Sequence, residues 1–384
     1  MKRQKQIVSL LLLCPILLTA CTASRLTTTE TDWTSRSPIG SMELQYAEQF
    51  TVTYYPDDYA WITIGEEQQC LLVPENQPVP EGLDASVTII QQPVSHLYLA
   101  ASSCMDLLDG LGALDSVRMT STKIEDWSLP AVQQAMEENE ILYVGKYSTP
   151  DYETIVSENC GLAIESTMIY HRPETKEQLE TLGIPVMVEQ SSYESHPLGR
   201  LEWIKLYGLL LDKEEEAAAL FQEQSAKLEH IQTDTEADTK KTVAFFYLST
   251  NGAVNVRKPG DYISKMIELA GGKYIFSASD LHVEENALST MNIQMETFYA
   301  LAKDADYLIY NSTVDGELDT MEQLLQKNAL LYDFKAVRNG DVWCTEKNMF
   351  QQTTGTADMI ADLHKIVTGE ADTETQLIFL HRLN

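Results

Sequence analysis

Strand-like and helix-like segments alternate along this chain in two separate runs, and this repeated alternation constrains the fold more than any other feature. The first run has β-rich segments at residues 86–90, 116–120, 141–144, 162–164 and 186–188, with helical patterns at residues 94–111, 152–157 and 173–182. The second has β-rich segments at residues 242–248, 307–310 and 341–344, with helical patterns at residues 261–270 and 356–367. Such alternation is typical of mostly parallel sheets covered by helices on both faces. The chain is therefore predicted to be an α/β protein with two Rossmann-like lobes.

A helical stretch without β-rich segments, residues 197–231, separates the two runs and is interrupted near Leu211. After the interruption, Asp212 is expected to act as the N-cap of a helix, because acids follow in the first turn where the helix dipole favours them. The expected apolar face of this helix consists of Ala217, Phe221, Leu228 and Ile231. Twenty helical residues span about 30 Å, the width of a small domain. We therefore expect one long, stiff helix to join the lobes.

Three short β-rich segments at residues 52–55, 60–64 and 69–73 precede the first run. Polar breaks separate them, and their residues alternate or favour strands, which is typical of an antiparallel start.

The first twenty residues have the composition of an export signal. Lys2, Arg3 and Lys5 precede an apolar run at residues 7–18, which is shorter than the roughly 20 residues of a spanning helix. The next residues, Leu-Thr-Ala-Cys at 18–21, resemble a bacterial lipobox, which implies that Cys21 becomes the lipid-modified first residue of the mature protein. Residues 21–40 are rich in Thr, Ser and charge and are expected to form a flexible tether.

The charge of the chain excludes some partners. There are 58 acidic and 27 basic residues, for a net charge of −31. Such a surface repels nucleic acid and anionic lipid headgroups. The cysteines beyond residue 21 are scattered, so we expect buried thiols rather than a disulfide framework: Cys70, Cys104, Cys160 and Cys344.

Four short motifs follow one another in an order that identifies a possible family. They are Gly-Lys-Tyr-Ser-Thr-Pro-Asp-Tyr-Glu at 145–153, His-Pro-Leu-Gly-Arg-Leu-Glu-Trp at 196–203, Met-Ile-Glu-Leu-Ala-Gly-Gly at 266–272, and Met-Glu at 295–296 ahead of Asp-Tyr-Leu-Ile at 306–309. With these motifs, residues 83–369 resemble the solute-binding proteins of the ferric-siderophore, heme and cobalamin type, the substrate-binding components of ABC importers. The resemblance implies a monomer without catalytic residues or a cofactor of its own, whose bound chelate would itself carry iron or cobalt.

The same resemblance implies two docking residues. In that family one glutamate on each lobe meets arginines of the membrane permease, and Glu153 and Glu296 occupy the matching positions. Exposed carboxylates pair with arginine in a fixed geometry that sets orientation. The alternative is that both are ordinary surface acids at helix N-termini. Two departures from the family pattern are Cys160-Gly161 in place of Pro-Asp and a longer interval between Glu296 and Asp306.

Candidate ligand-binding residues follow the predicted strands, because ligands of open α/β sheets bind beyond the carboxyl ends of the strands. In the first lobe the candidates are Ser95, Tyr147, Ser166, Met168, Tyr193 and His196. In the second they are Tyr247, Asn251, Arg257, Lys258, Tyr310, Met349 and Phe350. Aromatic faces and cations together suit a bulky, partly anionic chelate.

Each candidate has a structural alternative. Tyr247 and Tyr310 fit a strand core equally well, and Arg257 and Lys258 fit a charged loop. His196 fits either an axial metal ligand or a helix terminus, and we favour the helix terminus because no other ligand is suitably spaced.

The predicted organisation is a signal at residues 1–20, a tether at 21–40, a first lobe at 41–196, an inter-lobe helical region at 197–232 and a second lobe at 233–384. The expected function is that of an extracytoplasmic, lipid-anchored binding protein that delivers a chelate to an ABC permease. One alternative is a carrier of free zinc or manganese, although the seven histidines form no cluster. A secreted hydrolase is less favoured, because neither Gly-x-Ser-x-Gly nor His-Glu-x-x-His occurs.

Overall fold

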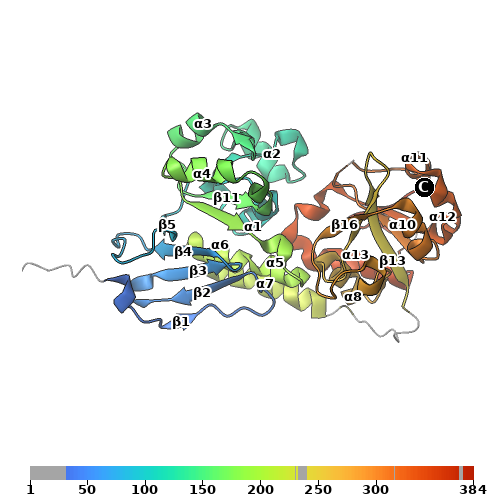
Figure 1. Ribbon diagram of the computed structural model, residues 1–384, viewed down its shortest axis with the longest axis horizontal. Helices are drawn as coiled ribbons and strands as arrows, with labels where there is room; N and C mark the ends of the chain where they lie inside the picture. The colour runs from blue at the N-terminus through green and yellow to red at the C-terminus, as the bar shows by residue number, and fades with distance from the viewer. Residues whose placement is uncertain (1–31, 230, 232–239, 315, 372–374) are drawn as a thin grey trace, which may run out of the picture.

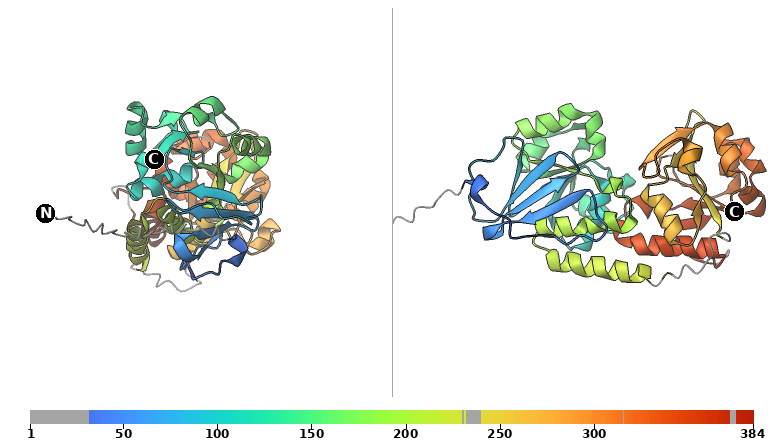
Figure 2. Two further views of the ribbon diagram at one scale, coloured as in Figure 1. Left: turned by 90° about the vertical axis from the view of Figure 1, so that its left-hand side faces the viewer. Right: turned by 60° about the horizontal axis from the view of Figure 1, so that its bottom comes forward.

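The chain forms two α/β lobes that lie side by side (Figures 1 and 2). The computed structural model describes residues 32–229, 231, 240–314, 316–371 and 375–384. The predicted signal and Cys21 lie outside the described residues. The predicted fold class, α/β with two lobes, is confirmed.

The first lobe begins with a five-stranded sheet. Its order is β1 (Gly40–Ser41), β2 (Phe50–Tyr54), β3 (Ala60–Ile64), β4 (Gln68–Val73) and β5 (Thr88–Gln91). The antiparallel pairing of β2, β3 and β4 confirms the predicted antiparallel start, whereas β5 pairs parallel to β4.

The predicted tether is wrong for residues 32–40. The short helix η1 (Trp33–Ser35) precedes β1, and the Trp33 ring stacks on Trp61 with ring centroids 5.4 Å apart. The Trp33 amide donates to the Glu81 carbonyl at 2.8 Å. Aromatic burial therefore orders this segment despite its polar composition.

A second, parallel sheet completes the first lobe. Its order is β12 (Val186–Glu189), β11 (Ala163–Ser166), β6 (Leu97–Leu99), β7 (Val117–Thr120) and β8 (Leu142–Tyr143). The accompanying elements are the helices α1 (Met105–Gly110), α2 (Pro130–Glu137), α3 (Tyr152–Ser157) and α4 (Pro173–Thr181), and a hairpin of β9 (Gly145–Lys146) and β10 (Thr149–Pro150).

The helix predicted at residues 94–111 is wrong in its first half, which contains the central strand β6. All three β6 residues are buried. A parallel strand that is buried on both faces lacks the polar–apolar alternation of a half-exposed strand, so its apolar run fits a helical pattern as well.

The second lobe has a seven-stranded mixed sheet. The order is β16 (Thr290–Ile293), β14 (Val254–Arg257), β13 (Thr242–Leu248), β17 (Tyr307–Tyr310), β18 (Val342–Thr345) and β19 (Leu380–Arg382), with β15 (Lys273–Tyr274) also paired to β13. The helices are α8 (Tyr262–Leu269), α9 (Ala278–Leu281), α10 (Met295–Ala302), α11 (Met321–Lys327), α12 (Lys335–Asn339) and α13 (Thr356–Thr368).

Three helices occupy the predicted inter-lobe region: α5 (Pro197–Glu202), α6 (Ile204–Leu210) and α7 (Glu214–Glu229). Helices α5 and α6 are buried in the first-lobe core, so α7 is the helix that spans the lobes (Figure 2). Its 16 residues extend about 24 Å. The predicted apolar face is confirmed within α7 for Ala217 and Phe221, which are buried in the first core, and for Leu228, which packs against both cores. Ile231 packs against the second core but lies beyond the end of α7.

Asp212 is not the N-cap of α7, so that prediction is wrong. Asp212 has a left-handed backbone with φ of 56°, and its Oδ1 accepts from Gln92 Nε2 at 2.9 Å. The Lys213 carbonyl instead accepts from the Ala217 amide at 3.0 Å, so α7 starts one residue later than predicted.

The four cysteines predicted to be scattered thiols are all free in the structure. Cys70, Cys104 and Cys344 are buried, and Cys160 is half-buried.

Candidate functional site

The lobes meet where loops follow the carboxyl ends of their strands. Thr353 Oγ1 of the second lobe donates to the Ser103 carbonyl at 3.1 Å, and the Thr354 amide donates to Asp106 Oδ2 at 2.6 Å. Ser103 and Asp106 follow β6, while the two threonines lie in the segment after β18. Open α/β sheets bind ligands at this edge, so the junction between the lobes is the candidate binding site.

Two arginines flank one aromatic ring at this junction. Arg200 from α5 lies with its guanidinium carbon 4.1 Å from the ring centroid of Tyr262, the first residue of α8. The guanidinium carbon of Arg257, at the end of β14, lies 5.6 Å from the same centroid and 5.5 Å from the ring of Phe350. Asp261 fixes the start of α8, because its Oδ1 accepts from the Ile263 amide at 3.0 Å.

The arginines are incompletely paired with acids. Arg200 is only 7% exposed, and its Nε is buried without a hydrogen-bond partner among the described residues. Arg257 Nη1 lies 3.5 Å from Asp261 Oδ2, at the upper limit of a hydrogen bond. Burial raises the pKa of the Asp261 carboxyl, and Arg257 opposes that rise. The cluster therefore retains capacity to hold an added anionic group.

A buried acid of the first lobe also faces this cluster. Glu189 ends β12, and its Oε1 accepts from the Ser191 amide at 2.9 Å. Burial raises the pKa of Glu189, while Ser191 and Arg200 act in the opposite direction.

Arg257 and Phe350 are the sequence-predicted residues that lie within this cluster. Met349, beside Phe350, is instead buried in the second core. Arg200, Tyr262 and Glu189 were not among the residues predicted from the sequence. The motif around Arg200 contained one signal, a cation within an otherwise apolar helix start.

Four other predicted residues lie along the carboxyl edge of the first-lobe sheet. Ser166 ends β11, and Met168 follows in η6 (Thr167–His171) with 49% of its surface exposed. Tyr147 is half-buried in the β9–β10 turn, and Tyr193 is 39% exposed in η7 (Ser191–Tyr193) after β12. Their position agrees with the prediction, and their contact with a ligand stays a prediction.

Three predicted residues lie near the end of β13 or β14. Asn251 Oδ1 accepts from Ser249 Oγ at 2.7 Å and therefore stabilises its own turn. Tyr247 packs against the second core, and Lys258 is half-buried after β14. Among the described residues, no hydrogen bond or cation–π contact joins Asn251 or Tyr247 to Arg200 or Arg257.

Ser95 and Tyr310 were placed wrongly. Ser95 precedes β6 and lies against Gly161 at the amino ends of the strands, where a Cβ on Gly161 would be 2.4 Å from the Ser95 carbonyl oxygen. Ser95 was misplaced because residues 94–111 were predicted to form a helix, whereas strand β6 begins at Leu97. Tyr310 is fully buried, with its ring centroid 5.8 Å from that of Phe246, so it is a core residue.

His196 has the helix-terminus role that the sequence favoured. It is the N-cap of α5, and its Nδ1 accepts from the Leu198 amide at 3.2 Å while its ring stacks on Tyr46. Burial lowers the pKa of His196 to about 4, with Lys265 acting in the same direction. The helix-terminus role of His196 is confirmed, and its contact with a ligand stays a prediction.

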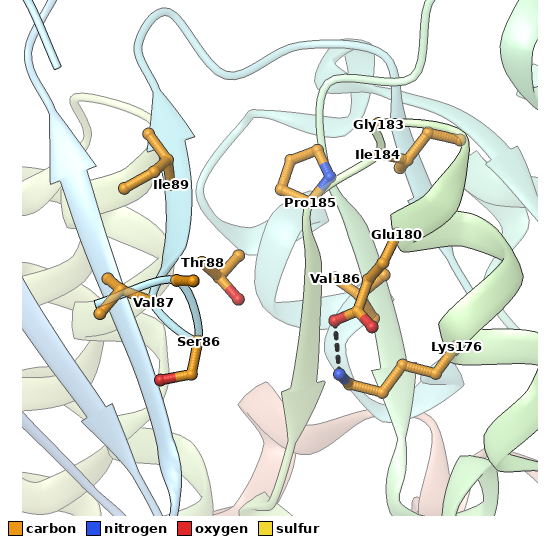
Figure 3. Close-up of a pocket in the computed structure, with 11 residues that line it drawn as sticks. Ser86, Val87, Thr88, Ile89, Lys176, Glu180, Gly183, Ile184, Pro185 and Val186 are labelled. Atoms are coloured by element: carbon orange, nitrogen blue, oxygen red, sulfur yellow. Dashed lines mark hydrogen bonds and ion pairs between the residues drawn. The ribbon is translucent and has the colours of Figure 1, made fainter. Parts of the chain in front are cut away.

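A concave region lies within the first lobe, between strands β5 and β12 (Figure 3). This groove encloses about 550 Å³. Figure 3 shows Ser86 and Thr88 on one side and Lys176 and Glu180 of α4 on the other, with the ion pair of the latter two at 2.5 Å. Because its lysine is already paired, the groove offers less to an anionic ligand than the junction does.

The predicted docking acids are both exposed. Glu153 lies in the first turn of α3, where Asp151 caps the helix by accepting from the Thr154 amide at 3.2 Å. Glu296 lies in the first turn of α10. Their role in docking stays a prediction.

Two general features of the described chain bear on function. No helix within the described ranges is long and apolar enough to cross a membrane. Over the same ranges, no three His, Cys, Asp or Glu side chains gather in a way that could hold a metal ion.

Two α/β lobes, a spanning helix and an incompletely paired cation cluster between the lobes define a bilobal ligand-binding protein. The periplasmic binding protein family matches residues 99–348, and the chain belongs to this family. The chain is accordingly a substrate-binding protein and not an enzyme.

The chain is also similar to a curated relative and to solved structures. The chain is 27% identical to an uncharacterized lipoprotein of Methanocaldococcus jannaschii over 85% of this chain and 82% of that one. Among solved structures, the periplasmic heme-binding protein HutB of Vibrio cholerae has a TM-score of 0.56 and 19% identity, over 70% of this chain and 98% of the other. The petrobactin-binding protein YclQ of Bacillus subtilis has a TM-score of 0.54 and 14% identity, over 73% and 93%. These structures share the fold.

Proposed function

We propose that this chain is the lipid-anchored substrate-binding component of an ABC importer and carries an iron–siderophore, heme or cobalamin-like chelate between its lobes. The observation that carries the proposal is Arg200, a buried guanidinium at the lobe junction whose Nε lacks an acceptor in the described structure. A buried charge without full hydrogen bonding costs free energy, which an anionic ligand would offset.

The surroundings of the arginines favour a chelate with flat, apolar parts. Tyr262 and Phe350 present rings beside the cations, and Met168 and Tyr193 are exposed at the carboxyl edge of the first lobe. Aromatic faces stack on flat ligands, and guanidinium groups bind carboxylates or catecholate oxygens. The ligand classes named for the structural neighbours, heme and siderophores, combine these features.

Attachment to the membrane rests on Cys21. The relatives from Methanocaldococcus jannaschii that cover most of this chain are named lipoproteins, and the lipobox resemblance places the lipid at Cys21. The residues between Cys21 and Asp32 reach at most roughly 40 Å when extended. A lipid at Cys21 would therefore keep the first lobe near the membrane and the permease.

Delivery rests on Glu153 and Glu296. Both carboxylates are exposed on separate lobes, so one partner with two suitably spaced arginines could engage both lobes at once. The alternative of a free zinc or manganese carrier has no supporting cluster among the described side chains.

Ligand binding tests the proposal directly. Hemin, a ferric catecholate, a ferric hydroxamate and cyanocobalamin would each be titrated against the protein while tryptophan fluorescence is recorded. We expect one of them to bind, and Arg200→Gln and Arg257→Gln each to weaken that binding by about tenfold or more. Arg338→Gln serves as the control, because Arg338 is exposed on α12. Failure of the whole panel to bind, or unchanged affinity in both variants, would overturn the proposal.

A further inference from the structure

The side chain of Gln351 crosses from the second lobe to the first. Its Oε1 accepts from the Ser128 amide at 2.7 Å and from Ser128 Oγ at 2.6 Å, and its Nε2 donates to the Asp126 carbonyl at 2.8 Å. Gln351 directly follows the short helix η10 (Lys347–Phe350) after β18. One carboxamide therefore satisfies three polar groups on the opposite lobe.

The first-lobe loop that bonds Gln351 is anchored in the core of that lobe. Asp126 and Ser128 flank Trp127, which is buried in the first-lobe core, and the Trp127 carbonyl accepts from Gln133 Nε2 at 2.8 Å. The hydrogen bonds of Gln351 to this loop therefore connect it to the core of the first lobe.

A second contact of η10 lies beside the first. Lys347 Nζ donates to the Glu125 carbonyl at 2.6 Å, so both ends of η10 are attached to the loop after β7. Phe350 lies between these attachments, with its ring 5.5 Å from the guanidinium carbon of Arg257. The element that attaches to the first lobe therefore also carries a ring of the proposed binding site.

These contacts are separate from those near the spanning helix. There, Gln224 Oε1 of α7 accepts from the Ala357 amide at 3.3 Å, and Lys227 Nζ lies 3.2 Å from Asp358 Oδ2. The contacts of α7 join the lobes along the spanning helix. The contacts of η10 and Gln351 join them at the loop after β7.

We propose that Gln351 is a positioning residue that latches the lobes together and holds Phe350 beside Arg257. In the latched state, η10 and the loop at residues 126–128 move as one unit. Loss of the latch lowers the fraction of molecules with the lobes correctly spaced, and the apparent affinity falls by that fraction. The effect on ligand rests on the proposed function, but the latch itself does not.

Amide hydrogen exchange tests the latch without any ligand. In the ligand-free protein, Gln351→Ala is expected to speed exchange of the Ser128 amide by about tenfold, because its acceptor is removed. Gln352→Ala is the matched control, since the Gln352 Oε1 accepts from Asn348 Nδ2 at 2.9 Å within the second lobe. Gln351→Glu keeps an acceptor for Ser128 but replaces the Nε2 donor with an oxygen that the Asp126 carbonyl repels, so exchange of the Ser128 amide should lie between that of the wild type and that of Gln351→Ala.

Affinity for hemin or a ferric catecholate provides the second measurement. We expect Gln351→Ala to weaken binding by roughly tenfold and Gln352→Ala to leave it unchanged. Unchanged exchange at Ser128 in Gln351→Ala would overturn the latch. Faster exchange with unchanged affinity would overturn the positioning role. Should no chelate bind the wild-type protein, the proposed function fails, while the exchange result still decides whether the latch exists.

Discussion

The guanidinium carbon of Arg200 lies 4.1 Å from the ring centroid of Tyr262, although the two residues belong to helices on opposite sides of the lobe junction. Arg200 belongs to α5, which is buried with the first-lobe core, and Tyr262 begins α8 of the second lobe. The stack therefore joins the lobes at the same place where the proposed ligand binds. The same pair of side chains thus contributes to the contact between the lobes and to the proposed binding site.

A double-mutant cycle measures this stack. Replacement of Arg200 by Lys retains the charge but loses the planar group, and Tyr262→Leu removes the ring. We expect a coupling energy of about 1 to 2 kcal/mol between Arg200→Lys and Tyr262→Leu in urea unfolding. Strictly additive effects would show that the two side chains do not interact in solution.

If Glu153 and Glu296 dock the permease, their substitution should impair transport without changing ligand affinity. Glu153→Ala and Glu296→Ala should each reduce ligand uptake in cells while ligand affinity of the isolated protein is unchanged, because both acids are exposed at the starts of α3 and α10 and are not part of the arginine cluster. Glu174→Ala is the control, since Glu174 is also exposed in the first turn of a helix, α4. Weaker ligand binding in Glu153→Ala would place that residue at the binding site instead.

The pKa of His196 predicts a loss of stability in acid. Burial lowers this pKa to about 4 in the folded protein, and Lys265 contributes in the same direction. The unfolded chain takes up the proton near pH 6.5, so the free energy of unfolding should fall as pH decreases from about 6.5 toward 4. His196→Asn keeps an N-cap acceptor without a titrating ring. Urea unfolding should show a weaker dependence on pH over this range in the variant; equal slopes would contradict the assignment.

His381 has the opposite pH dependence. The Cys344 side chain, the Leu318 carbonyl and the Glu346 carboxylate raise its pKa to about 10 against the effect of burial, and its two ring nitrogens lie 2.7 Å from the Glu346 and Leu318 oxygens. The protonated ring therefore stabilises the fold below about pH 6.5, and this stabilisation is lost as the pH rises toward 10. In His381→Gln, thermal unfolding should be less sensitive to alkaline pH. The assignment is wrong if the variant retains the wild-type dependence.

The regular elements that could be predicted are those whose pattern is local. Residues 152–157 and 242–248 have the predicted structure, because a capped helix and a β-branched and aromatic strand carry their signals within a few residues. Strand β6 was missed because its short apolar run is defined by neighbouring strands on both sides. Strand β14 was also missed: it is only four residues long, Val-Asn-Val-Arg, and it pairs with β13 in a hairpin and with β16 on its other side.

The binding site was predictable only where it follows a recognised strand or motif. Arg257 was identified because it follows an apolar run, whereas Glu153 was selected from a family motif and its docking role stays a prediction. Arg200 was missed because its importance depends on Tyr262, which lies far along the sequence and reaches it only when the lobes pack. For His196 the sequence offered two roles, a metal ligand or a helix terminus. The structure shows the helix terminus, because the ring accepts from the nearby Leu198 amide and stacks on Tyr46.

The position of a bound chelate tests the central claim most directly. A crystal of the protein grown with hemin or a ferric catecholate would be measured at the iron absorption edge, and the anomalous peak would locate the metal. The account predicts a single peak between the lobes, with the ligand in contact with Arg200, Arg257 or Phe350. A peak in the groove between β5 and β12, or elsewhere on the outside of one lobe, would contradict it.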